Sequence, residues 1–139
     1  MKSIINYLFF AILAFGILSA CTKKDSESDA YNKAIVKLLG KWTFMNATTN
    51  DHYSNADHIN AIAAASGDYM EFMNNGRASL RIFSAQDTSK YTLVGDSKLI
   101  FDDVDQFDIK MLTETEFVFV RKTVYSSAAY KEETYSLKK

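Results

Sequence analysis

The sequence has one cysteine, no proline and five glycines among its 139 residues. The single cysteine, Cys21, cannot form a disulfide within the chain or a metal site built from several thiolates. The lack of proline removes the residue that cannot donate a backbone hydrogen bond to a neighbouring strand. We therefore expect a chain able to form many paired strands, and one that folds without disulfides.

The sequence also has no excess of charge of either sign, because it contains 16 basic and 17 acidic side chains. A nucleic-acid-binding protein needs a basic face, so this balance argues against that class. The apolar run from Leu8 to Leu18 is shorter than the roughly 20 residues that cross a bilayer. We expect no nucleic-acid partner and no membrane-spanning helix.

The N-terminal region has the order of a secretory signal, with Lys2 ahead of that apolar run. The run ends in Leu18-Ser19-Ala20-Cys21, which resembles the lipobox of bacterial lipoproteins. The resemblance implies that Leu18, Ser19 and Ala20 are the peptidase recognition positions, that the chain is cut before Cys21, and that Cys21 carries the lipid. The alternative is an ordinary secretory signal with a cysteine at the cut by chance.

Three segments follow from this interpretation: residues 1–20 as lipoprotein signal peptide, 21–29 as lipidated cysteine and flexible tether, and 30–139 as one domain. The tether is polar throughout after Cys21. It resembles the charged export tag of surface lipoproteins in one Gram-negative phylum, or it is a generic solvated linker. Thr22 differs from the aspartate that retains lipoproteins in the inner membrane of enteric bacteria, so we expect an outer-membrane location, periplasmic or surface-exposed.

Two short helices are predicted. The first is capped by Asp29, places Tyr31, Ile35, Leu38 and Leu39 on one face, and ends at Gly40. The second lies in an insert, residues 50–66, where Ile59, Ile62 and Ala63 recur at helical spacing.

Short segments of alternating apolar and polar residues make up most of the remaining domain. They are separated by turn residues at the spacing typical of sandwiches and barrels. The predicted strands are 41–45, 68–73, 77–83, 90–94, 98–101, 106–112, 116–122 and 130–137. We predict an all-β fold in which these eight antiparallel strands close into an up-and-down barrel, so that no sheet edge remains.

The order of motifs resembles the lipocalin-like domain of small bacterial lipoproteins. The likeness rests on Leu39-Gly40-Lys41-Trp42, on residues 69–76 ending in Asn74-Asn75-Gly76, and on the later segments 91–93, 99–101, 107–113 and 116–119. It implies that Gly40 and Trp42 form the floor of the barrel. It also implies that a basic side chain from a late strand stacks on Trp42, with Arg121 as the candidate.

Motifs for catalysis and metal binding are weak. Asp51-His52 and Asp57-His58 are six residues apart, which does not place both histidines on one helical face, so we interpret them as loop residues. The acidic run Asp102 to Asp108 lacks the glycine and distal glutamate of a calcium loop. We therefore expect no metal and no cofactor.

A non-enzymatic protein is predicted, because no catalytic motif is present. An acid–base pair such as Glu71 and Asp108 inside the barrel stays open as a third hypothesis.

Aromatic side chains on the predicted strands favour either a filled interior or an apolar cavity. The inward positions expected to meet a small apolar ligand are Phe44, Met70, Phe72, Leu80, Ile82 and Phe117. The first hypothesis is therefore an envelope lipoprotein, anchored in the membrane through its lipid, that binds a small hydrophobic molecule in the barrel. The alternative is a filled barrel that acts as a protein–protein interaction module, with a partner that the sequence does not identify.

Overall fold

The computed structural model describes residues 22–53, 56–82 and 84–139. The lipobox residues Leu18, Ser19 and Ala20 and the lipid acceptor Cys21 lie outside the described residues. Within the described part, the chain forms helix α2 (Thr22–Leu38) and nine strands. The strands are β1 (Gly40–Tyr53), β2 (Ala56–Ala63), β3 (Tyr69–Phe72), β4 (Arg77–Ile82), β5 (Ala85–Val94), β6 (Lys98–Phe101), β7 (Asp105–Leu112), β8 (Glu116–Ser126) and β9 (Ala129–Lys138).

The strands form a closed antiparallel barrel of eight strands. Consecutive strands pair from β3 to β9, β1 pairs with β3, and the additional pairing of β1 with β9 closes the ring. The prediction of an eight-stranded up-and-down barrel with an N-terminal helix is confirmed. We call the end of the barrel at which β1 begins the floor, and the turns at 74–76 and 95–97 lie at this end. The opposite end, which has the turn at 102–104, is the mouth.

The predicted helix in the insert is wrong. Residues 50–66 extend β1 to Tyr53 and then form β2, which pairs with β1 from Asn46↔Ala63 to Tyr53↔Ala56. Every residue of β2 is exposed, so a helix here would find no core for its apolar stripe. The extended form instead gives β1 a partner on both sides, since β1 also pairs with β9 as far as His52.

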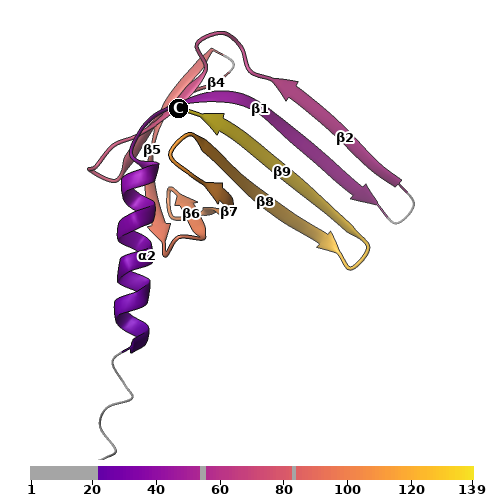
Figure 1. Ribbon diagram of the computed structural model, residues 1–139. Coiled ribbons are helices and arrows are strands. Elements are labelled where there is room, and N and C mark those ends of the chain that lie inside the picture. Colours follow the sequence, from indigo (N-terminus) through magenta and orange to yellow (C-terminus); the bar gives the residue numbers. More distant parts are fainter. Residues whose placement is uncertain (1–21, 54–55, 83) are drawn as a thin grey trace, which may run out of the picture.

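This extension changes the outline of the molecule. The hairpins β1–β2 and β8–β9 project together beyond the rest of the barrel (Figure 1). This four-stranded projection comprises residues 46–63 and 121–134 apart from 54–55.

Helix α2 is longer than predicted. It begins at Thr22, so residues 22–29 are helical and not a flexible tether, and Asp29 is not the capping residue. The sequence from Thr22 to Leu38 contains neither glycine nor proline, so nothing in it interrupts helical hydrogen bonding. In the part of the chain that the structure describes, no helix combines the length and apolar character needed to cross a membrane.

The end of α2 closes the floor of the barrel. Ala34 and Leu38 are buried, and the indole Nε1 of Trp42 donates a hydrogen bond of 2.7 Å to the carbonyl of Leu38. Gly40 has φ +104°, a conformation open to glycine, and this lets the chain turn directly from the helix into β1.

Aromatic rings fill the barrel above this floor. Trp42 contacts Phe117 at 5.5 Å between ring centroids, and Phe72 contacts Phe117 edge-on at 5.9 Å. The rings of Phe117 and Phe119 continue the stack at 4.8 Å. Such tilted and edge-on contacts add to the burial of large apolar surfaces, so the lower half of the barrel is a packed core.

Candidate functional site

Lys139, and not Arg121, is the basic side chain on the floor tryptophan. Its Nζ lies 4.4 Å from the centroid of the Trp42 ring. It also donates hydrogen bonds of 2.6 and 2.9 Å to the carbonyls of Lys37 and Leu39, which end helix α2. Arg121, which was predicted to stack on Trp42, instead lies over the Phe107 ring, at another height in the barrel. Arg121 follows Phe117 and Phe119 toward the mouth, so it cannot reach the floor.

A cavity of about 350 Å³ occupies the upper half of the barrel, between the aromatic core and the mouth. Its apolar wall is formed by Met70, Leu80, Ile82, Phe101, Phe107 and Phe119. Its polar wall is formed by Asp87, Ser89, Asp102, Asp105, Arg121 and Tyr135. The volume lies near the lower end of the range in which proteins bind small molecules, so the cavity fits one small ligand.

The sequence-predicted ligand positions divide between this cavity and the core. Met70, Leu80 and Ile82 line the cavity. Phe44, Phe72 and Phe117 are at most 2% exposed and belong to the packed core. The interior is thus filled by side chains near the floor and contains a cavity near the mouth. The sequence left a filled interior and a cavity as alternatives, and the barrel has one in each half.

Alternation along the strands accounts for the polar wall that the sequence reasoning missed. Arg121 comes two residues after buried Phe119, and Asp105 comes two residues before buried Phe107, so both face inward. Asp87 pairs with Leu80 and therefore shares its face. The predicted strand began at Lys90, whereas β5 begins at Ala85, and this placed Asp87 outside the predicted barrel.

Arg121 is at the centre of an ion-pair network at the mouth. One terminal guanidinium nitrogen lies 2.8 Å from Oδ1 of Asp105, and the other lies 2.7 Å from Oε2 of Glu133. Lys131 lies 3.1 Å from the second Glu133 oxygen. The guanidinium carbon is also 5.3 Å from the centroid of the Phe107 ring. Two cations and two carboxylates therefore hold one another in place on the inner face of β7, β8 and β9.

The pKa values of these groups reflect that network. Burial raises the pKa of the Glu133 carboxyl, but the hydrogen bonds and charges of Arg121 and Lys131 outweigh it, and the net shift is downward. Burial also raises the pKa of the Tyr135 phenol, and the charge of Glu133 adds to the rise. At neutral pH Glu133 is therefore ionised, and Tyr135 in the cavity wall is neutral.

Glu71 and Asp108 do not meet inside the barrel. Their neighbours Met70, Phe72 and Phe107 are buried, so alternation places both carboxylates on the outer surface. The acid–base pair suggested from the sequence has no access to the cavity.

The two Asp-His pairs face each other across the β1–β2 hairpin. Asp51 is opposite His58 and His52 is opposite Asp57, with a hydrogen bond between His52 Nδ1 and a carboxylate oxygen of Asp57. His52 also stacks on Tyr130 at 4.6 Å. Among the described residues, no three His, Cys, Asp or Glu side chains come together as they would to hold a metal ion.

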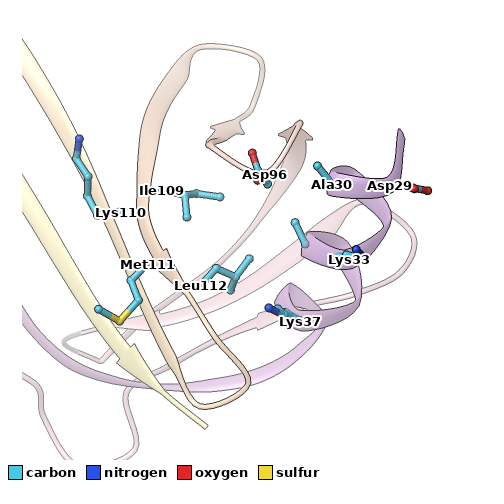
Figure 2. Close-up of a pocket in the computed structure, with 10 residues that line it drawn as sticks. Asp29, Ala30, Lys33, Lys37, Asp96, Ile109, Lys110, Met111 and Leu112 are labelled. Atoms are coloured by element: carbon cyan, nitrogen blue, oxygen red, sulfur yellow. The ribbon is translucent and has the colours of Figure 1, made fainter. Parts of the chain in front are cut away.

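A second hollow, of about 610 Å³, lies outside the barrel between α2 and β7. Figure 2 shows Ile109 and Leu112 between the strand and the helix, with Ala30, Lys33 and Lys37 on the helix side. The groove is lined by three basic and two acidic side chains, those of Lys33, Lys37, Lys110, Asp29 and Asp96. This groove lies on the outer surface and carries charges of both signs, whereas half of the residues that line the barrel cavity are large apolar side chains, so the barrel cavity is the better candidate for a ligand site.

No family model matches the chain, and no curated protein matches it. A solved lipocalin structure, the deswapped triple mutant of bovine odorant binding protein, is similar over 74% of both chains, with 17% identity and a TM-score of 0.44. A likeness at this level establishes no family, and the barrel assignment here follows from the strand pairing itself.

Proposed function

We propose that the protein is a lipid-anchored envelope lipoprotein of a bacterial outer membrane, and that its barrel binds one small molecule without catalysis. The observation that carries the binding function is the cavity between the aromatic core and the mouth of the barrel. Its wall combines apolar side chains with a few polar groups that converge on one end. Such a wall excludes water from the apolar body of a ligand and orients its polar group.

Filling the cavity tests the binding function. The full-length protein, purified from cells, is extracted with organic solvent, and the extract is examined by mass spectrometry. The variant Ser89→Phe adds a ring to the cavity wall and should lose the co-purifying molecule. Thr88→Phe is the matched control, because Thr88 is exposed on the opposite face of β5. A molecule retained equally by both variants, or absent from the parent protein, argues against the cavity as its site.

The anchor rests on the lipobox resemblance at Leu18, Ser19, Ala20 and Cys21. The expected result for Cys21→Ser is loss of the protein from the membrane fraction and loss of labelled palmitate incorporation, because the thiol that accepts the lipid is gone. Cell fractionation and labelling measure both. Unchanged membrane association would contradict the lipoprotein assignment, and the ligand cavity would be unaffected by that result.

The alternative function, a protein–protein interaction module, is favoured by one specific feature. The edge strand β2 is eight residues long, fully exposed, and carries neither lysine nor proline, the residues that commonly protect a sheet edge. Photo-crosslinking in cells from Ile59, which is 69% exposed, compared with Thr88 on the barrel wall, tests it. A discrete adduct specific to Ile59 that Asn60→Pro abolishes would support docking along this edge.

A further inference from the structure

The carboxylates at the mouth outnumber the cations that could neutralise them. The cavity is lined by Asp87, Asp102 and Asp105 against one guanidinium, that of Arg121, which gives a formal charge of −2. Adding Glu133 and Lys131, which are linked to Arg121, leaves this total unchanged. The formal charge of the cavity is therefore −2 whether or not Glu133 and Lys131 are counted with the residues that line it.

Arg121 is not available to an anionic ligand. Its Nε and one terminal nitrogen are bonded to Glu133, and the other terminal nitrogen is bonded to Asp105. An anion at this position would have to displace a carboxylate that is already ion-paired and partly buried, which costs the pair its mutual attraction. The guanidinium of Arg121 therefore neutralises carboxylates of the protein and is not free to bind a ligand.

Asp87 and Asp102 are placed differently. Each accepts a backbone hydrogen bond, Asp87 from Thr88 and Asp102 from Lys90, and neither forms an ion pair with any residue that the structure describes. The ammonium of nearby Lys90 is bonded to Asp103, which does not line the cavity. Two carboxylates at the mouth can therefore form an ion pair with a cationic ligand.

The wall below them suits a cation with an apolar body. Phe101, Phe107 and Phe119 line the cavity, and the faces of aromatic rings attract cations. Phe107 already has the guanidinium of Arg121 over its ring, 5.3 Å from the centroid. An apolar body would lie against Met70, Leu80 and Ile82.

Building on the proposed binding function, we infer that the ligand is a small organic cation, an amine or quaternary ammonium with an apolar body, whose charged group lies at the mouth between Asp87 and Asp102. The apolar body lies deeper in the cavity, against Met70, Leu80 and Ile82, and the aromatic rings of the wall add to the attraction for the cation. This assigns the polar wall a role in selecting the charge of the ligand, a role that an apolar cavity would not have.

Three probes with one body and different head groups test the inference. Phenylbutyltrimethylammonium, phenylbutanol and phenylbutyrate are titrated into the full-length protein in lipid nanodiscs, with empty nanodiscs as blank, by isothermal titration calorimetry. The cation should bind most tightly and the anion most weakly. The affinity of the cation should fall as ionic strength rises, because salt screens charges at the mouth.

Asn substitutions then locate the interaction. Asp87→Asn and Asp102→Asn should each weaken binding of the cation about fivefold, the factor that one charge–charge attraction at contact distance supplies in water. Binding of phenylbutanol should not change, and it serves as the control for folding. The matched control variant is Asp108→Asn, which removes one carboxylate from the outer face of β7 and should leave all three probes unaffected.

The outcomes separate this inference from the function on which it rests. Equal or weaker binding of the cation relative to phenylbutanol, or cation binding unchanged in both Asn variants, would overturn the charge preference and leave the ligand cavity in place. Tighter binding of phenylbutyrate would assign the mouth to an anion instead. Failure of all three probes to bind would remove both the inference and the proposed cavity function.

Discussion

At the scale of single residues, Glu133 is the side chain whose ionisation ties the mouth of the barrel together. It is 13% exposed and is bonded to both Arg121 and Lys131. The pKa of its carboxyl lies below its ordinary value of 4.5. A carboxyl with a lowered folded-state pKa contributes stability above its unfolded pKa, and that contribution is lost as the pH falls through the folded value.

Glu133→Gln should therefore destabilise the protein by about 2 kcal/mol at pH 7, the range of a hydrogen-bonded charge that loses its partner. The difference from the parent should shrink as the pH is lowered below about 4.5, because the carboxyl is protonated first in the unfolded chain, and it should disappear once the folded carboxyl is protonated as well. Urea unfolding at several pH values measures this. Glu132→Gln, on the opposite face of β9, is the control. A difference from the parent that stays constant with pH would contradict the role of this ionisation.

Lys139 acts at the other end of the barrel. Its ammonium lies over Trp42 and bonds two carbonyls at the end of α2, where the helix carries partial negative charge. Lys139→Met should lower the free energy of unfolding by about 1 kcal/mol. Lys138→Met removes the same charge one residue earlier, from an exposed pair with Glu116 at 3.6 Å, and should have little effect. Equal effects of the two variants would argue against the stacking on Trp42.

At the scale of elements, helix α2 is held to the barrel by few side chains. Leu38 is fully buried, whereas Val36 is 71% exposed. Leu38→Ala should cost about 3 kcal/mol, because it removes buried methyl groups and leaves a cavity under the floor. Val36→Ala should stay within about 0.5 kcal/mol of the parent protein. Thermal unfolding of both variants measures the difference, and similar losses would mean that the helix is not anchored through Leu38.

The elements also show how far the sequence alone predicts this fold. Alternation located the eight barrel strands, because Trp42 and Phe44, or Phe117 and Phe119, recur at the period of a strand with one buried face. The insert was mispredicted, because Ile59 and Ile62 are compatible with either period when the partner strand is unknown. β2 is extended because β1 is there to pair with it, which is a property of the tertiary structure.

The candidate site was predicted less completely than the fold. Alternation indicates that Arg121 faces inward, but it does not give the height of that side chain in the barrel, so floor and mouth could not be distinguished. The cavity depends on where the aromatic rings stop filling the interior, and on a strand β5 that starts five residues earlier than its apolar pattern suggests. Both are outcomes of packing between strands distant in sequence.

At the scale of the whole molecule, the closed ladder and the aromatic core should make the barrel a single cooperative unit. Phe117 is fully buried and contacts Trp42, Phe72 and Phe119. Phe117→Ala should cost about 4 kcal/mol, a large part of the stability of a domain of this size.

Unfolding of that variant should remain a single transition, reported at the same midpoint by Trp42 fluorescence and by far-ultraviolet circular dichroism. The parent protein is the reference for both signals. Separate midpoints in the variant would show that the floor and the remainder of the barrel unfold independently.

The position of α2 sets the route by which a ligand arrives. With the anchor proposed at Cys21, the lipid would be attached at the N-terminal end of α2, a helix of 17 residues and about 26 Å whose later turns lie against β7 at the floor end of the barrel. The mouth, at the opposite end of the barrel, would then open away from the attachment point and toward the aqueous phase. Ligand exchange would then follow the concentration of dissolved molecules, without partition into the bilayer, and a water-soluble cation is a solute suited to that route.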